Sequence, residues 1–220
     1  SVLCLIWSAS RGAWIAAGIS MMAVSFLSVK KRIVSAGLIT AFSSVLLVAF
    51  GIQSSTIKQR IETALIPAEW SNRLPLYQSA VKIFLDHPVF GTGIGTFEKV
   101  LHRPAYELPP DYPVASELNL HAHNTYLEIA AEMGLAGLIS FLGIFAVFFR
   151  MALQHITGSG GKRDEDMHAA LIGLAAAVFA VLIFACSTSI ITVGVNSAVY
   201  FWLTFAMAAG FLSRHSLRKT

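Results

Sequence analysis

Side chains that can exchange protons gather in the stretch HAHNTYLEIAAE. His121 and His123 precede an apolar segment, and Glu128 and Glu132 lie inside it. Imidazole and carboxylate groups are the usual proton donors and acceptors in enzymes near neutral pH. If this segment is helical, Asn124, Glu128 and Glu132 share one face, because each lies four residues after the last. The stretch therefore places candidate acid and base groups at the start of an apolar helix.

The two glutamates need an explanation if the segment crosses a membrane. A carboxylate that faces hydrocarbon is costly, so we expect Glu128 and Glu132 to face a polar cavity within the protein. The helix N-terminus also favours negative charge. Ionisable residues within membrane-spanning segments usually belong to functional sites, so we favour a functional role for Glu128 and Glu132. The alternative is that both acids only pair with polar groups of other helices.

A metal site is a weaker interpretation of the same residues. His121 and His123 could bind a metal ion with Glu128 as a third ligand. However, a His-x-His pair faces one side of a strand rather than of a helix, and the H-E-x-x-H pattern is absent. We expect no metal or other cofactor, and histidines that act as a base or are hydrogen-bonded.

The composition is that of a membrane protein. Hydrophobic residues make up 55% of the chain and charged residues 13%, against roughly 25% charged residues in soluble domains. The mean hydropathy is +0.67. Crossing a bilayer takes about 20 apolar residues, and such runs lie at 12–29, 33–52, 126–150, 168–187 and 195–213. The sequence predicts an all-α, polytopic membrane protein: a helical bundle with one large extracytoplasmic loop that contains an amphipathic helix.

Basic residues predict the orientation, because Lys and Arg collect in short cytoplasmic loops. They follow the first, third and fifth apolar runs, which puts all three clusters on one side. The predicted divisions are transmembrane helices in 1–52 with an extracytoplasmic turn at 8–11, an extracytoplasmic loop at 53–125, and three transmembrane helices with a basic cytoplasmic tail in 126–220. Residues 1–9 are too few to cross a membrane, so we expect a truncated helix and a C-terminal fragment. Because the charge of +4 forms no patch, it predicts no nucleic-acid partner.

The predicted extracytoplasmic loop should contain an amphipathic helix that lies on the membrane or on the bundle. Ser71 or Asn72 could cap it, and Asp86, His87 and Pro88 should end it. Apolar residues at helical spacing are Leu76, Ala80, Val81 and Phe84. Arg73 should lie in the first turn and share a face with Tyr77, four residues on.

Two further features could contact an anion. The run GTGIGTF, residues 91–97, lacks the strand and helix of a dinucleotide fingerprint, so a glycine turn is favoured, although its N–H groups could still face an anion. Arg11 should lie at an extracytoplasmic turn between two helices. Its position fits an interfacial anchor as well as it fits an anion-binding residue.

Together these motifs resemble the bacterial O-antigen ligase superfamily, which includes O-antigen polymerases and protein O-oligosaccharyltransferases. The resemblance covers about residues 5–145. It rests on SRG at 10–12, R-x-x-x-Y at 73–77, HPVFGTGIGTF at 87–97 and HAHN-x9-G-x-x-G at 121–137. It implies an inner-membrane glycosyltransferase with a periplasmic active face. Such an enzyme transfers a glycan, without a metal and with inversion, from undecaprenyl pyrophosphate to an acceptor hydroxyl.

The resemblance also implies roles for residues. The family's essential histidine corresponds to His123, the base that activates the acceptor hydroxyl, and its arginines correspond to Arg11 and Arg73, which bind the pyrophosphate. His121, Asn124, Glu128 and Tyr77 are then expected to support the site. The expected partners are the lipid-linked glycan donor, lipid A-core or another glycan acceptor, and the bilayer.

Two function classes follow, and the first is favoured. The first is a glycan transferase, with O-antigen ligase as the leading form and polymerase or protein transferase as alternatives. The second is a polysaccharide or lipid transporter. Transporters often contain two repeated halves with broken helices, and no internal repeat is evident, whereas a single large loop favours the transferase.

Overall fold

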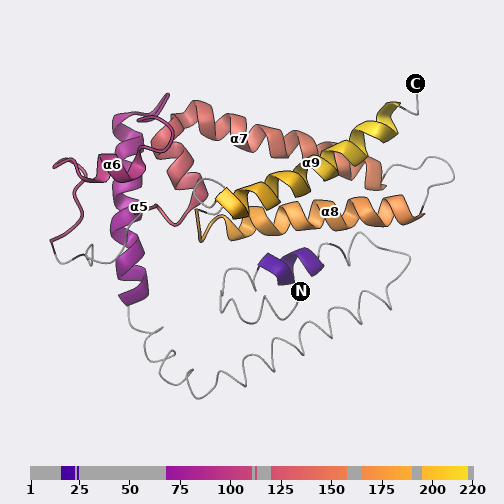
Figure 1. Cartoon of the computed structure of the whole chain (residues 1–220), viewed down its shortest axis with the longest axis horizontal. Coiled ribbons are helices and arrows are strands. Elements are labelled where there is room, and N and C mark those ends of the chain that lie inside the picture. Colours follow the sequence, from indigo (N-terminus) through magenta and orange to yellow (C-terminus); the bar gives the residue numbers. More distant parts are fainter. Residues whose placement is uncertain are drawn as a thin grey trace, which may run out of the picture. The chain divides into compact units, whose positions relative to one another are not determined.

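The computed structural model describes residues 16–22, 24, 68–110, 112, 120–157, 165–189 and 195–217. Within them every regular element is a helix, which confirms the all-α prediction for this part of the chain (Figure 1). The named helices are α5 (Ala68–Asp86), α6 (Phe97–Leu101), α7 (Thr125–Thr157), α8 (Glu165–Phe184) and α9 (Val195–Leu217). Residues 16–22 and 24, within the first predicted span, are also helical. Arg11, the predicted turn at 8–11 and the predicted span at 33–52 lie outside the described residues.

The three long helices α7, α8 and α9 fall on the apolar runs predicted at 126–150, 168–187 and 195–213. Among the described residues, α7 is the one helix long and apolar enough to cross a membrane. Two shorter apolar helical stretches follow, His168–Phe184 and Ala198–Gly210. The number of crossings and their orientation remain predictions.

The described residues fall into two compact units. One contains the second half of α7, with α8 and most of α9, and an aromatic cluster packs these helices together. Phe145 lies 5.1 Å from Phe205 between ring centroids, and Phe149 lies 5.9 Å from Phe179. The other unit contains α5, α6, the first half of α7 and the turn after α8. All of the candidate site described below lies in this second unit.

Helix α5 extends further toward the N-terminus than predicted. It begins at Ala68, before the expected caps, and contains Pro75, but it ends at Asp86 as predicted. Ala and Glu residues ahead of the expected caps favour continuation of the helix, and a capping side chain does not by itself start one. As a result, Arg73 lies in the second turn of α5 and not in the first.

The buried stripe of α5 differs from the predicted one, because Val81 is exposed and Phe84 is only half-buried. Leu76 and Ala80 are fully buried, as expected, whereas Val81 is 43% exposed. Ile83 is fully buried in its place, because residues at i, i+4 and i+7 lie on one helix face. The stripe packs on α6 and on Ala131 of α7, within one hydrophobic core.

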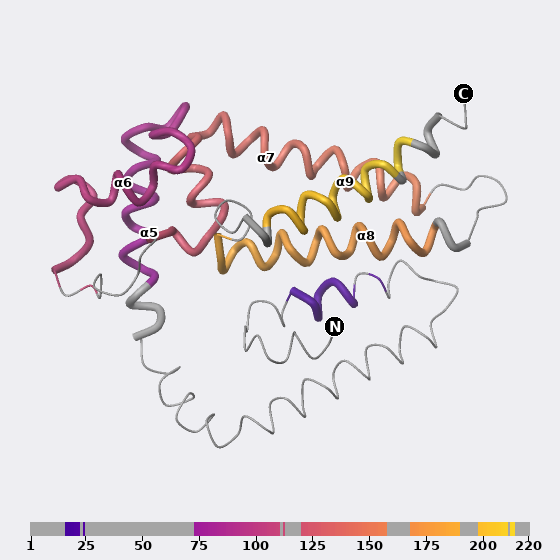
Figure 2. The backbone as a smooth tube through the Cα atoms, in the orientation of Figure 1, coloured from indigo at the N-terminus to yellow at the C-terminus, as the bar shows by residue number. Residues whose placement is uncertain are grey.

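Helix α7 is broken at Gly134, where φ is 64° and ψ is −162°; the tube in Figure 2 changes direction within α7. The N–H groups of Leu135 and Ala136 would otherwise bond to the carbonyls of Ala131 and Glu132, four residues back. They instead donate to the carbonyls of the 88–93 segment, Pro88 at 2.8 Å and Val89 at 3.1 Å.

The same segment satisfies the two carbonyl groups that the break releases. The N–H of Thr92 donates to the Ala131 carbonyl at 3.1 Å, and that of Gly93 to the Glu132 carbonyl at 2.8 Å. Each of the four backbone groups freed at Gly134 thus has a partner in the 88–93 segment, as buried backbone groups require. We call this arrangement the backbone clasp.

The clasp needs glycine on both sides. A Cβ on Gly134 would lie 2.4 Å from the carbonyl atoms of Val89, and a Cβ on Gly91 would lie 2.3 Å from the carbonyl carbon of Glu132. Both glycines also have positive φ, which a side chain disfavours. The backbones of α7 and of the 88–93 segment therefore approach more closely than any residue other than glycine would allow at these two positions.

Gly134→Ala should destabilise the full-length protein strongly, by about 3 kcal/mol or more, because it adds both a backbone clash and a disfavoured φ. Gly143→Ala is the matched control in the same helix. Its Cβ would meet nothing within 4 Å, so it should be neutral or stabilising by up to about 1 kcal/mol. Thermal unfolding in detergent measures both. Equal melting temperatures for the two variants would contradict the clasp.

Candidate functional site

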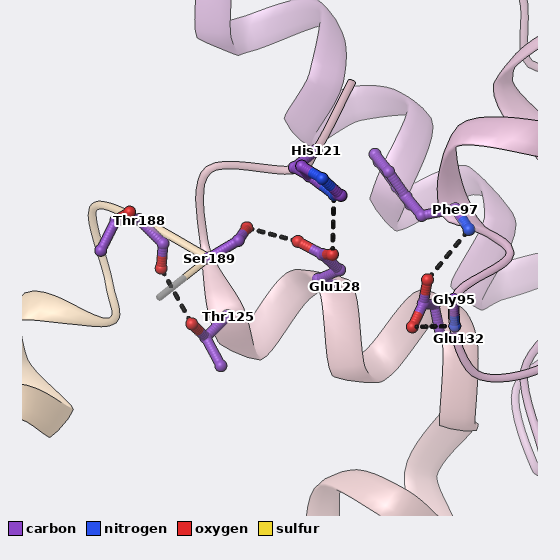
Figure 3. A network of polar contacts seen from close by, with 8 residues as sticks. All are labelled: Gly95, Phe97, His121, Thr125, Glu128, Glu132, Thr188 and Ser189. Atoms are coloured by element: carbon purple, nitrogen blue, oxygen red, sulfur yellow. Dashed lines mark hydrogen bonds and ion pairs between the residues drawn. The ribbon is translucent and has the colours of Figure 1, made fainter. Parts of the chain in front are cut away.

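The glycine run is a turn, as predicted. The anion that its N–H groups contact is a side chain of the protein itself, the carboxylate of Glu132. Gly91, Gly93 and Gly95 all have positive φ. The carboxylate of Glu132 accepts hydrogen bonds from the N–H of Gly95 and the N–H of Phe97, both at 2.9 Å (Figure 3). Glu132 is only 6% exposed. Because the glutamate occupies these donors, the run is tied to α7 and is not a phosphate loop.

The first turn of α7 is fixed by hydrogen bonds from two directions. The side-chain oxygen of Asn124 accepts from the N–H groups of Tyr126 and Leu127, at 3.0 and 3.1 Å, which is the usual geometry of a helix N-cap. The Thr125 hydroxyl donates to the Thr188 carbonyl at 2.8 Å, and its N–H donates to the Ala185 carbonyl at 2.9 Å. The turn at 185–189 therefore lies against the start of α7.

A buried carboxylate joins three segments next to this cap. Glu128 is 2% exposed. One of its oxygens lies 3.2 Å from Nδ1 of His121, and the other accepts a short hydrogen bond from the Ser189 hydroxyl (Figure 3). Both glutamates are buried within the protein; they bond to protein groups, and a polar cavity beside them stays a prediction. The partners of Glu128 lie in loops, whereas Glu132 accepts from Gly95 in a loop and from Phe97 at the start of α6.

The environment of His121 favours its charged form. The hydrogen bond with Glu128 raises the pKa of His121, and the negative charges of Glu128, Glu98 and Glu132 act in the same direction. Partial burial opposes the shift but is outweighed. The imidazolium form of His121 therefore persists to a higher pH than in an unperturbed histidine.

His123 has an unusual backbone conformation. Its φ is 48°, and it is the one non-glycine residue with positive φ in the part of the chain that the structure describes. This conformation costs an ordinary residue about 1 kcal/mol or more, and such residues concentrate at functional sites. Ala122, which is fully buried, and the Asn124 cap hold the chain on either side. The fold thus holds His123 in a conformation that local preferences disfavour.

Arg73 reaches the same 185–189 turn from α5. Its Nη1 donates to the carbonyl of Ser187 at 3.0 Å, and the residue is otherwise exposed. Tyr77 lies one helical turn further along α5 and is half-buried. Through Ser187 and Ser189, the turn contacts both Arg73 and the carboxylate that holds His121.

The structure thus brings several predicted residues to one place and shows what sequence reasoning missed. Arg73 and Glu128 both bond to the 185–189 turn, and His121 bonds to Glu128, whereas Arg11 lies outside the described residues. Ser187 and Ser189 were not singled out. The signal that could have found them is the polar run CSTS, at the end of an apolar segment. No group of three or more side chains of ligating type is arranged for a metal ion within the described ranges, so the metal interpretation gains no support from them.

Comparison with known proteins identifies the class of the molecule. The chain matches the O-antigen ligase family over residues 1–142, which is 142 of its 220 residues. The protein belongs to this family of membrane-associated, glycosyltransferase-like enzymes of lipopolysaccharide biosynthesis. A comparison with curated proteins gave no match. The resemblance inferred from the sequence motifs is therefore confirmed at the level of the family.

Glu132→Gln should lower the free energy of unfolding by about 1–3 kcal/mol, because an amide replaces a carboxylate that accepts two backbone N–H groups. Glu107→Gln, at an exposed position, removes the same charge and should change stability by less than about 0.5 kcal/mol. Chemical or thermal unfolding of both full-length variants measures the difference. If both unfold alike, Glu132 does not hold the glycine turn.

Proposed function

We propose that the protein transfers a glycan from undecaprenyl pyrophosphate to an acceptor hydroxyl on the periplasmic face of the bacterial inner membrane. O-antigen transfer to lipid A-core is the leading form, and polymerase or protein transferase activity is the alternative. Family membership supports this function most directly. The bonds of Arg73 and Glu128 to the 185–189 turn, and of His121 to Glu128, support the location of the site.

The membrane setting has support from α7 itself. Large apolar side chains along the helix are exposed, including Leu135 at 49%, Ile139 at 61% and Leu142 at 47%. A row of exposed leucines and isoleucines on a long apolar helix is unfavourable in water and suits contact with lipid. The basic clusters predict that the N-terminal end of α7 faces the periplasm.

The proposed chemistry requires a proton acceptor and an anion site. A sugar hydroxyl is a weak nucleophile, and His123 acts as the base that accepts its proton. The departing pyrophosphate is stabilised by the guanidinium groups of Arg73 and Arg11, because forked donors match phosphate oxygens. Inversion follows if the hydroxyl attacks the anomeric carbon opposite the leaving group. Asn124, Glu128 and Tyr77 support these groups.

The experiment that separates the forms of this function is deletion of the full-length gene in its host. Loss of all O-antigen from otherwise normal lipid A-core indicates a ligase. A single O-unit on the core indicates a polymerase. Unchanged lipopolysaccharide with altered glycoproteins indicates a protein transferase. Unchanged glycoconjugates of every kind, with defective export of a lipid or polysaccharide, would support the transporter alternative.

His123→Asn should lower transfer by about 10²- to 10⁴-fold, the usual effect of losing a general base. Asparagine tolerates positive φ, so the variant should keep its melting temperature. His102→Asn, an exposed histidine after α6, serves as the matched control and should retain full activity. Transfer by purified full-length variants from a defined donor gives the rates. Normal transfer by His123→Asn would remove His123 from the mechanism.

Arg73→Lys should lower turnover by about 10²-fold, because an ammonium group keeps the charge but loses the forked geometry. The variant should remain folded, since Arg73 is exposed and makes one hydrogen bond to a backbone carbonyl. The same transfer assay, with a melting curve alongside, tests this. Wild-type turnover in Arg73→Ala would exclude Arg73 from pyrophosphate binding.

A further inference from the structure

We infer that His121 is a further ligand for the donor's pyrophosphate, and that Glu128 is the positioning residue that orients it. This inference rests on the proposed function and assigns a substrate contact to a residue that the sequence motifs place only in a supporting role. Its basis is the hydrogen bonding of one imidazole ring, together with the surroundings of that ring.

The ring of His121 has one nitrogen committed and one available. Nδ1 lies 3.2 Å from the buried Glu128 carboxylate, which can only accept a hydrogen bond when ionised. Nδ1 must then carry a hydrogen. Nε2 has no hydrogen-bond partner in the described structure, and 24% of the side chain is exposed. Nε2 is therefore the atom that a ligand would meet.

The state of Nε2 depends on the charge of the ring. With Nδ1–H donated to Glu128, a neutral ring presents a lone pair at Nε2, which repels a phosphate oxygen. Only the imidazolium presents an Nε2–H donor. Such a charge-assisted hydrogen bond to phosphate is about twice as strong as a neutral one. Anion binding by His121 therefore requires the protonated ring.

Acidic groups on both neighbouring helices favour that protonated state. Glu128 and Glu132 on α7 and Glu98 on α6 all raise the pKa of His121, while burial lowers it. Because the pKa is raised, the donor at Nε2 is present at low pH and persists to a higher pH than usual. It is lost as the pH rises through the pKa of His121.

The 185–189 turn brings this donor toward Arg73. The Ser189 hydroxyl donates to the Glu128 carboxylate, which holds His121. Two residues before Ser189 in the same turn, the carbonyl of Ser187 accepts a hydrogen bond from Arg73. Arg73 uses one N–H in that contact, and a guanidinium carries five. A pyrophosphate has two phosphoryl groups. A guanidinium bonded to the turn and an imidazolium linked to the same turn through Glu128 are suited to it.

The test measures binding of a sugar-capped undecaprenyl pyrophosphate, without an acceptor, to full-length protein in detergent from about pH 5.5 to about pH 9. The cap removes the terminal phosphate proton that would otherwise titrate at about pH 6, so the charge of the probe stays constant. Wild-type affinity should fall as the pH rises through the pKa of His121. In Glu128→Gln the fall should occur at a lower pH, by on the order of one unit, because the charge that stabilises the imidazolium is lost. Affinity just above the shifted midpoint should then be up to about tenfold weaker than in the wild type.

Two further variants complete the test. Glu107→Gln removes the same charge from an exposed position and should keep the wild-type pH profile. His121→Gln offers an amide N–H that does not titrate, so its affinity should be weaker at low pH and nearly independent of pH. This variant tests the inference even if Glu128→Gln fails to fold.

The inference is overturned if wild-type affinity does not vary over this pH range, if Glu128→Gln keeps the wild-type midpoint, or if His121→Gln keeps the wild-type profile. These outcomes are separate from failure of the proposed function. A full-length protein that shows the expected profiles but transfers no glycan would contradict the function alone. Normal transfer with unaltered profiles in both site variants would contradict the inference alone.

Discussion

The backbone clasp at Gly134 is the constraint on which the rest of the candidate site depends. A helix that breaks inside an apolar region releases backbone groups that no solvent can satisfy. Here the 88–93 segment supplies partners for both N–H groups and both carbonyls. Glycine at positions 91 and 134 permits the contact. The turn is thereby fixed to α7 by the main chain, and Glu132 fixes the following residues by its side chain.

The clasp determines the positions of the functional groups through the packing of the neighbouring helices. The glycine turn leads into α6, whose buried residues pack with Leu76 and Ile83 of α5. This packing orients α5 and so carries Arg73 to the carbonyl of Ser187. On α7, Glu128 lies one helical turn before Glu132, so the same rigid segment that holds the glycine turn also presents the carboxylate for His121. The site is positioned by a helix and two loops that are tied to it.

Sequence reasoning predicted those features that depend on local pattern. The end of α5, the glycine turn and the shared face of Asn124, Glu128 and Glu132 follow from spacing and residue type. It did not predict the break at Gly134, because glycine does not interrupt a run of apolar residues in hydropathy. It also could not assign Glu132 to the glycine turn and Glu128 to His121 and Ser189. Those partners lie 35 or more residues away for Glu132 and up to 61 away for Glu128, and periodicity has no information at that range.

The two buried glutamates are better explained by geometry than by stability. Burial of a carboxylate is unfavourable even when hydrogen bonds offset the loss of water, and well-packed apolar residues of similar volume are often at least as stable. Such residues would fill the space on α7 but would not accept the N–H groups of Gly95 and Phe97, nor orient the ring of His121. The acids therefore contribute order where an apolar pair would contribute only packing. Glu132 holds the glycine turn, and Glu128 holds His121 and Ser189. The two glutamates lie one helical turn apart on α7, so the positions of the glycine turn and of the polar site are coupled.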